Sequence, residues 1–347
     1  MHSLTQNFLN RLVFSAPEAS VLRALGEYRG KQVLFSKQSP ETLNSLRMLA
    51  KVESVESSNR LEGIELPAKK IEELVLQGTA PKNRSEQEIA GYRDVLNLIH
   101  ESAKDIPFTP NTILQLHSLL SLYMPNPGGH WKITDNEIIE EYPDGTQRVR
   151  FSPVKAFLTN DAMVNLTQNY QHSLSEPFHD PLVLIPLAVL DFLCIHPFSD
   201  GNGRIARLLT LLLLYHFDYQ VGRYISLERI FEENKIGYYE TLEASSKSWH
   251  EGEHDVKPWL NYFWGMLIRA YREFEARVGV VTTIRGSKTE FVRSAINRKL
   301  SPFSINDIAS ECLGVSRDMI KRILRQMRDE GLITVTSSGR GALWKKN

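Results

Sequence analysis

Cysteine is scarce in this sequence. Its 347 residues include only Cys194 and Cys312, which lie far apart and form no C-x-x-C pair. Neither a disulfide framework nor a cysteine metal site is indicated, so we expect a cytoplasmic protein in a reducing compartment.

Long apolar runs are also missing. Residues 1–13 lack the apolar segment and the small-residue cleavage site of a signal peptide. The most apolar stretch, residues 181–198, is interrupted by Pro186, Asp191 and His196. Because a membrane span needs roughly 20 uninterrupted apolar residues, we expect buried helices and no membrane contact.

The sequence carries no net charge, since 41 basic residues balance 41 acidic ones. The chain as a whole therefore has no field that attracts nucleic acid or an anionic membrane, and any such affinity has to be local. Its 42% hydrophobic and 24% charged residues are typical of globular proteins. At roughly 100–200 residues per domain, the length predicts two or three compact units.

Helical periodicity dominates what the sequence does contain. Apolar residues recur at three- and four-residue steps and predict an all-α body. The predicted helices cover residues 42–60, 68–76, 85–100, 110–121 and 153–172. Residues 133–151 differ, because a Pro-Asp-Gly turn at 143–145 separates two short β-favouring runs. We expect a β-hairpin lying on the helical body.

The pattern changes near residues 278–287, whose glycine, serine and threonine content predicts a linker. Beyond it, the sequence shows a helix-turn-helix pattern followed by two short strands that fit a wing. These elements cover residues 304–309, 318–330, 331–335 and 342–344. We therefore predict a small winged-helix domain at 288–347.

The chemistry is concentrated in the run HPFSDGNGRIAR, from His196 to Arg207. Gly201 and Gly203 leave backbone N–H groups open to phosphate oxygens, and the N-terminus of the following helix adds partial positive charge. Asp200 has the carboxylate that Mg²⁺ uses when it bridges two phosphates. The run therefore predicts a phosphate-binding loop.

The other polar residues of this run suit phosphoryl-type chemistry, in which positioning and charge neutralisation dominate. Asn202 can donate to an oxygen on which negative charge develops. Arg204 and Arg207 supply charge-assisted donors. His196, with an ordinary pKa near 6.5, can take the proton from an attacking hydroxyl.

Each of these residues alone also has a simpler interpretation. A single His at a helix end is more often a cap or a core residue, and a G-x-G fragment is often only a turn. Other known motifs do not fit the run: no G-x-x-x-x-G-K-[ST] occurs, a Rossmann fingerprint lacks its third glycine, and no second His follows His196 at the zincin spacing.

The complete string resembles the signature of the Fic (Fic/Doc) family, H-x-F-x-[DE]-G-N-G-R-x-x-R. Every fixed position is matched, by His196, Phe198, Asp200, Gly201, Asn202, Gly203, Arg204 and Arg207. The Doc branch phosphorylates its target and typically has Lys at the position of Gly203. This copy therefore resembles the adenylylating branch.

The resemblance implies a Fic helical bundle at 106–277, preceded by an N-terminal helical segment at 1–105. It implies transfer of AMP from ATP to a Ser, Thr or Tyr hydroxyl of a target protein, and of the enzyme itself, with Mg²⁺. His196 would be the base and Asp200 the metal ligand. The loop from Gly201 to Gly203 would hold the phosphates near the base. Arg204 and Arg207 would contact the outer phosphates.

Two further segments resemble parts of that family's site. Residues 134–139 resemble the flap that docks an extended target segment by strand pairing. The expected docking residues are Asn136, Glu137, Ile138 and Ile139, although Glu137 and Ile139 depart from the aromatic residue and the glycine common there. Tyr238 and Tyr239 resemble the pair beside adenosine; being adjacent on a helix, they cannot face the same way, so we expect one in the core.

Residues 58–63, SNRLEG, resemble the family's inhibitory motif [ST]-x-x-x-E-[GN]. Ser58 and Glu62 share one helix face. Glu62 is expected to pair with Arg207 and to remove the guanidinium that holds the γ-phosphate of ATP. A simpler interpretation is an exposed Glu at a helix end with Gly63 as the cap.

Partners are less clearly indicated. The second C-terminal helix carries five basic residues, Arg317, Lys321, Arg322, Arg325 and Arg328. They suit DNA phosphates, but Asp318, Asp329 and Glu330 dilute the patch, so DNA binding is not favoured. Removal of AMP, with Glu62 activating water, and a DNA-binding regulator that senses nucleotide stay open as alternative functions. A homodimer is also open, since relatives often pair through helices.

Overall fold

The computed structural model describes residues 3–35, 40–126, 128–141, 145–176, 179–279, 287–299, 302–312, 315–336 and 342–346. Within them helices predominate, as predicted, and strands form two small antiparallel sheets. The body contains α1 (Gln6–Leu9), α2 (Ala16–Phe35), α3 (Pro40–Leu61), α4 (Ala68–Leu76), α5 (Arg84–Ser102), α6 (Pro110–Leu120), α7 (Thr159–Ser175), α8 (Pro181–Ile195), α9 (Asn202–His216), α10 (Leu227–Glu233), α11 (Lys235–Ser246) and α12 (Lys257–Gly279). No helix in these described ranges is long and apolar enough to cross a membrane.

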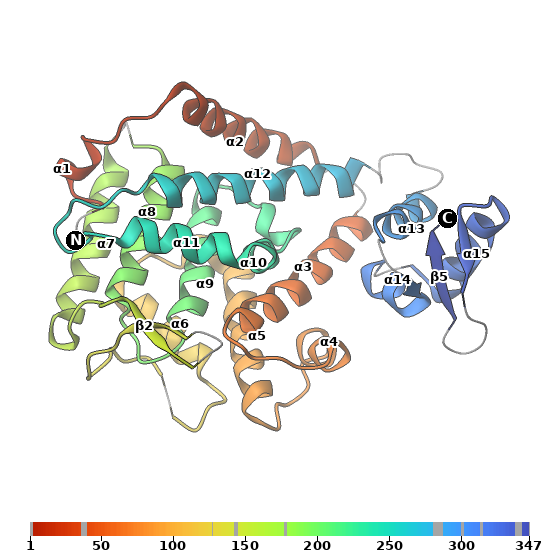
Figure 1. Ribbon diagram of the computed structural model, residues 1–347, viewed down its shortest axis with the longest axis horizontal. Helices are drawn as coiled ribbons and strands as arrows, with labels where there is room; N and C mark the ends of the chain where they lie inside the picture. Colours follow the sequence, from red (N-terminus) through yellow and green to blue (C-terminus); the bar gives the residue numbers. More distant parts are fainter. Residues whose placement is uncertain are drawn as a thin grey trace.

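One hydrophobic core runs through the body from Leu4 to Val278. Helix α8 is buried almost all round, as its continuous apolar sequence requires. It packs against α7, α9, α11 and α12, and α9 packs in turn against α5 and α6 (Figure 1). The predicted segments 1–105 and 106–277 therefore contribute to the same core.

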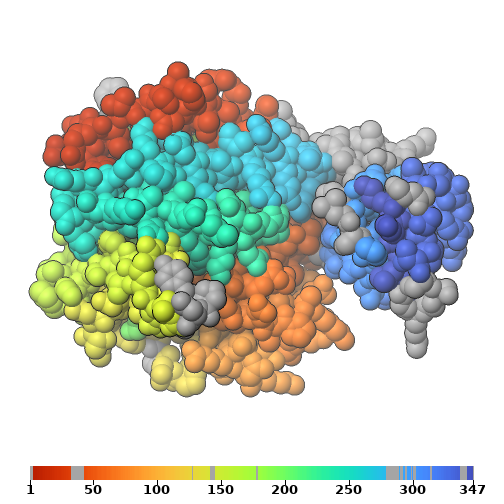
Figure 2. Space-filling model, in the orientation of Figure 1, coloured from red at the N-terminus to blue at the C-terminus, as the bar shows by residue number. Residues whose placement is uncertain are grey.

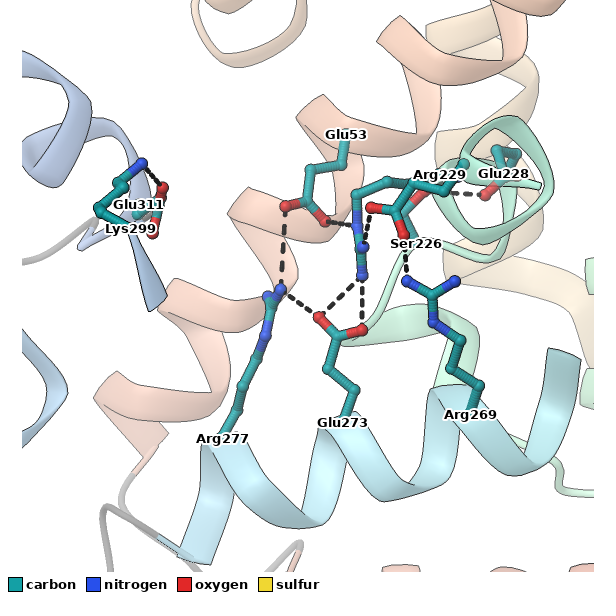
Figure 3. A network of polar contacts seen from close by, with 10 residues as sticks. Glu53, Ser226, Glu228, Arg229, Arg269, Glu273, Arg277, Lys299 and Glu311 are labelled. Carbon is teal, nitrogen blue, oxygen red and sulfur yellow. Dashed lines mark hydrogen bonds and ion pairs between the residues drawn. The ribbon is translucent and has the colours of Figure 1, made fainter. Parts of the chain in front are cut away.

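Helix α3 is fixed to the body by a network of charged side chains (Figure 3). Arg229 of α10 donates to Glu53 of α3 at 3.2 Å and to Glu273 of α12 at 2.7 Å. Arg277, near the end of α12, also contacts Glu273, at 2.5 Å. Ser58 lies in the last turns of α3. By holding α3 in place, this network also fixes the position at which these turns meet α9.

The predicted hairpin is present. Strand β1 (Ile138–Glu141) pairs antiparallel with β2 (Gln147–Phe151), and the register shifts between Ile138 and Ile139. The turn falls largely on 142–144, outside the described residues. Arg150 of β2 donates to Glu243 of α11 at 2.8 Å and ties the hairpin to the body. Figure 2 shows the yellow-green hairpin segment against the teal helical segment on the same face.

The C-terminal unit has a core of its own, which includes Phe303, Ile323 and Trp344. It contains α13 (Ser287–Arg298), α14 (Ile305–Glu311), α15 (Arg317–Asp329) and the strands β3 (Phe303–Ser304), β4 (Ile333–Val335) and β5 (Leu343–Lys346). The sheet order is β3-β5-β4. Helix α12 ends at Gly279 and most of the predicted linker, 280–286, lies outside the described residues.

Some elements differ from the prediction. Helices α2 and α12 were not among the predicted ranges. Leu25 of α2 is buried in the core of the body, and Tyr28 of α2 stacks on Tyr271 of α12. Residues 153–155 are not helical, and α7 begins only at Thr159. The reason is tertiary: Val154 N–H bonds the Cys194 carbonyl, and Ala156 N–H bonds the Asp135 carboxylate at 2.8 Å.

Candidate active site

A cleft of about 530 Å³ lies between the hairpin, the loop joining α8 to α9, helix α11 and the end of α3. Its lining brings together most of the predicted site residues. They are Glu62, Ile138, Ile139, His196, Asp200, Gly201, Asn202, Gly203, Arg207, Tyr238 and Tyr239. Four separate stretches of sequence thus meet at one cavity, which is the arrangement a ligand site requires.

His196 ends α8 in a left-handed conformation with φ of 50°. Such a conformation is costly for a residue with a Cβ, and it turns the chain sharply into the loop. The ring Nδ1 lies 3.3 Å from the Leu193 carbonyl oxygen. Because a carbonyl only accepts, Nδ1 carries the hydrogen and Nε2 keeps its lone pair. Burial lowers the pKa of His196 to about 4, so the ring is a neutral base at pH 7.

The loop after His196 is held by Asn202. Its side-chain oxygen accepts from Phe198 N–H at 2.9 Å and its amide donates to the Phe198 carbonyl at 2.7 Å. The Phe198 ring is fully buried beneath the loop. Asn202 itself is only 3% exposed, so its first task is to close the loop. This differs from the expectation of a side chain whose main contact is a phosphate.

The glycines of the loop are needed for different reasons. Gly201 has φ of +81° immediately before α9, where a residue with a Cβ would be strained. At Gly203, an added Cβ would stand 2.4 Å from Glu62 Oε1. Gly203 therefore allows the carboxylate of α3 to approach the backbone of α9.

Arg207 of α9 is 2% exposed and points at the end of α3. Its guanidinium donates to Glu62 Oε1 at 2.7 Å, to the Ser58 hydroxyl at 2.8 Å and to the Ser58 carbonyl at 2.9 Å. Burial is the largest single influence and opposes the charged form, but the charge of Glu62, its hydrogen bond and the nearby Tyr238 and Tyr92 together raise the pKa of Arg207. The pairing of Glu62 with Arg207 is present as predicted. Glu62 and Gly63 form the turn directly after α3, and Gly63 has φ of +76°.

Asp200 offers a single carboxylate at the edge of the cleft, with its side chain 72% exposed. Oδ1 accepts from Gly201 N–H at 2.6 Å, and Oδ2 lies 3.3 Å from Arg204. Among the described residues no three His, Cys, Asp or Glu side chains converge as metal ligands. Mg²⁺ typically takes one or two carboxylates together with substrate phosphates, so the chemistry of Asp200 fits that ion.

Tyr238 and Tyr239 have different surroundings, as their adjacent positions on one helix required. Tyr238 is 3% exposed and packs on Phe231 and Trp259, so it belongs to the core even though it borders the cleft. Tyr239 is partly exposed to the cleft and lies under Arg150, whose guanidinium carbon is 5.6 Å from the ring centroid. Tyr239 is therefore the ring of the pair that is partly exposed to the cleft.

Arg204 lies elsewhere than expected. Its guanidinium is buried and donates to Glu88 of α5 at 2.7 Å. It borders a second cavity on the other side of the loop and is absent from the lining of the cleft. Helical geometry explains this, because residues three apart on α9 point in directions that differ by about 60° and only Arg207 reaches α3. A contact of Arg204 with phosphates in the cleft is not supported by this placement.

The predicted flap residues have two roles: one anchors the flap to the loop, and the others lie beside the cleft. Asn136 donates to the Phe198 carbonyl at 3.1 Å and accepts from Lys132 at 2.7 Å, so it anchors the flap and does not present itself to a target. Ile138 and Ile139 border the cleft, and Ile139 is 49% exposed. Glu137 is exposed beside them. Within the described residues β1 pairs only with β2, which leaves its other edge for a further strand.

Two supporting residues were missed by sequence reasoning. Lys132 is 3% exposed and donates to the Ile195 carbonyl at 3.1 Å, directly before His196. Burial lowers the pKa of Lys132 to about 8. His117 of α6 contacts the loop from the opposite side, and burial lowers its pKa to about 4. Their spacing carries no motif, so only the fold reveals them.

Comparisons with known proteins agree with this geometry. Residues 107–214 match the model of the Fic/DOC family, whose members are typically transferases. A Fido domain-containing protein of Dictyostelium discoideum is 30% identical over 87 residues, which are 25% of this chain and 59% of that protein. The matched part thus spans about three fifths of that relative.

Solved structures show the same fold. A Fic domain containing signaling protein from Bacteroides thetaiotaomicron aligns with a TM-score of 0.61 at 24% identity, over 75% of this chain and 98% of that one. A Fic family protein from Desulfovibrio desulfuricans aligns with a TM-score of 0.62 at 19% identity, over 97% of both chains. Fic-1 from C. elegans aligns with a TM-score of 0.58 at 18% identity, over 76% and 73%. The chain therefore has the Fic fold, and its residues 107–214 are similar to the Fic/DOC family.

Proposed function

We propose that this protein transfers AMP from ATP to a hydroxyl side chain of a target protein and of itself, and that Glu62 inhibits this activity by occupying Arg207. The observation that carries the proposal is the meeting of a neutral His196, the glycine loop and Arg207 in one cleft beside Tyr239. A base, an anion cradle and an aromatic surface are the groups that nucleotide transfer requires.

The reaction follows from the chemistry of the cleft. Nε2 of His196 takes the proton of the target hydroxyl, and the hydroxyl oxygen forms a bond to the α-phosphorus of ATP. The bond from that phosphorus to the diphosphate breaks, and diphosphate leaves. Mg²⁺, when bound at Asp200, would neutralise charge on the phosphates. Backbone N–H groups at the start of α9 face developing charge on the α-phosphoryl oxygens.

Inhibition follows from the contacts of Arg207. Three hydrogen bonds to Ser58 and Glu62 occupy its guanidinium. A γ-phosphate that reached Arg207 would also meet the Glu62 carboxylate, and like charges repel. Binding of ATP in a productive position therefore requires Glu62 to move away, which its 32% side-chain exposure permits.

The hairpin provides the place for the target. The open edge of β1 borders the same cleft as His196, so a segment paired with β1 brings its side chain toward the base. Strand pairing uses backbone groups, which suits a target recognised by its extended conformation. The residue type that carries the hydroxyl is then selected by distance to Nε2 of His196.

The test is incubation of purified protein with labelled ATP and Mg²⁺, followed by mass spectrometry of the modified residues. We expect little labelling of the parent chain and at least tenfold more for Glu62→Gly. Adding His196→Ala should return the labelling to background. The matched control is Glu65→Gly, the same substitution three residues further on and exposed; it should label like the parent. Equal labelling of Glu62→Gly and parent would contradict the inhibition.

Removal of AMP is the second candidate, because the Glu62 carboxylate lines the same cleft and can face a water beside a bound AMP group. The two directions are separated by giving the parent chain a target that Glu62→Gly has labelled. Release of AMP by the parent but not by Glu62→Gly supports removal, and stable labelling supports inhibition alone.

A further inference from the structure

The second cavity, of about 750 Å³, lies on the other side of the loop and shares Ser199, Asp200 and Gly201 with the cleft. His117, in α6, borders this cavity and contacts the loop at two points. The proposed function gives this residue no role, although it touches the segment that carries the predicted metal ligand.

The tautomer of His117 is fixed by its neighbours. Gly129 N–H donates to Nδ1 at 3.0 Å, so Nδ1 is the acceptor and Nε2 carries the hydrogen. Nε2 then donates to the Asp200 carbonyl oxygen at 3.1 Å. The ring also stacks on Phe198, with centroids 3.7 Å apart and planes 12° from parallel. His117 thus holds the loop by one ring contact and one directed hydrogen bond.

The hydrogen bond matters because of the peptide plane that it holds. In a trans peptide the C=O and the following N–H point in opposite directions. With the Asp200 carbonyl directed at His117, Gly201 N–H is directed away from it, and there it donates to Asp200 Oδ1 at 2.6 Å. The contact on one side of the loop therefore orients the carboxylate on the other.

We propose that His117 is a positioning residue that orients the Asp200 carboxylate for Mg²⁺ bound with ATP, an inference that rests on the proposed function. Asp200 has a competing partner, since Oδ2 already lies 3.3 Å from Arg204. If the peptide plane rotated, Oδ1 would lose Gly201 N–H and the carboxylate would be free to turn toward that guanidinium. His117 prevents this rotation and keeps the carboxylate available to the ion.

The experiment measures ATP affinity by calorimetry with and without Mg²⁺, in the Glu62→Gly chain. His117→Phe keeps a stacking ring but removes both nitrogens, and His117→Asn has an amide too short to reach the carbonyl. We expect both to reduce the Mg²⁺-dependent gain in ATP affinity at least fivefold and to change the affinity without Mg²⁺ less than twofold. His117→Gln, whose amide N–H reaches the position of Nε2, should restore most of the gain.

The control is His130→Phe, which lines the same cavity and should leave the gain unchanged. In labelling assays the same variants should raise the Mg²⁺ concentration for half-maximal rate more than they lower the rate at saturating Mg²⁺. An unchanged gain in His117→Phe or His117→Asn overturns the inference, as does an equal loss with and without Mg²⁺, which marks a purely structural role. If the Glu62→Gly chain binds no ATP at all, the proposed function fails and the inference falls with it; Mg²⁺-dependent binding that ignores His117 overturns the inference alone.

Discussion

Arginines occur near the start of α9 in the body and along the length of α15 in the C-terminal unit, but their surroundings differ. Arg204 and Arg207 of α9 are 5% and 2% exposed and pair with carboxylates more than a hundred residues away in sequence. Arg322 and Arg325 of α15 are exposed, and Arg328 pairs with the adjacent Asp329.

The difference shows which arginine side chains have an orientation fixed by the fold. A buried guanidinium has a direction fixed by its partners, and breaking such a pair is costly. Exposed pairs contribute roughly 0–1 kcal/mol and leave the side chain free to move. The body therefore uses arginine as a positioned group, whereas α15 offers charge without fixed position. The following predictions break or sharpen this contrast, beginning with the largest effect.

Replacing Arg207 by Met in the Glu62→Gly background should abolish labelling, and the same replacement in the parent chain should lower the free energy of unfolding by about 3 kcal/mol. That value lies at the lower end for a broken buried pair, because Glu62 keeps 32% exposure and can be hydrated. The matched change Arg325→Met on α15 should cost less than about 0.5 kcal/mol. Urea denaturation measures both, and equal costs would remove the contrast.

Ile323→Ala tests whether the two cores are independent. Ile323 is 1% exposed in the C-terminal core, and truncating a buried Ile costs about 2–5 kcal/mol. Because this core contains no residue of the body, we expect faster amide exchange in α13 to α15 and little change in α8 and α9. Labelling by Glu62→Gly should also stay unchanged. Faster exchange throughout the body would show that the cores unfold together.

The pH dependence of labelling tests the environment of His196. Its pKa is lowered by burial to about 4, so the ring stays neutral as pH falls through 6 and becomes protonated only near pH 4. Labelling by Glu62→Gly should therefore change less than about twofold from pH 8 to 5.5, then fall toward pH 4. With an ordinary His pKa near 6.5, labelling would already be about tenfold lower at pH 5.5. The initial rate at each pH distinguishes the two.

The exposed arginines of α15 should have the smallest effect on the enzyme. Replacing Arg322 and Arg325 by Glu should leave labelling unchanged and stability within about 0.5 kcal/mol. If this unit binds DNA, the double substitution should weaken binding to duplexes of any sequence. It should also reduce the salt dependence of the DNA affinity by about one counterion per lost phosphate contact. Fluorescence anisotropy at several salt concentrations measures this. Unchanged DNA binding would place the contact elsewhere.

Much of the site could be predicted because the run from His196 to Arg207 is contiguous. Adjacent residues stay together in any fold, so a base, an acid and a glycine loop in twelve positions keep their proximity. The pairing of Glu62 with Arg207 could be predicted only from the resemblance to the family's inhibitory motif, since no local pattern links α3 to α9. The sequence predicted that one of Tyr238 and Tyr239 lies in the core, but not which one. Adjacent positions on a helix alone do not say which face meets the body.

Sequence by itself determined the helical body, the hairpin and the chemical content of the loop, since periodicity, turn residues and a contiguous motif are local properties. Only the tertiary structure decided that Arg204 faces Glu88, that Asn202 closes the loop and that His117 holds Asp200. The physical reason is that a side chain's hydrogen-bond partner is chosen by what the fold brings within about 3 Å, and those partners lie on helices distant in sequence.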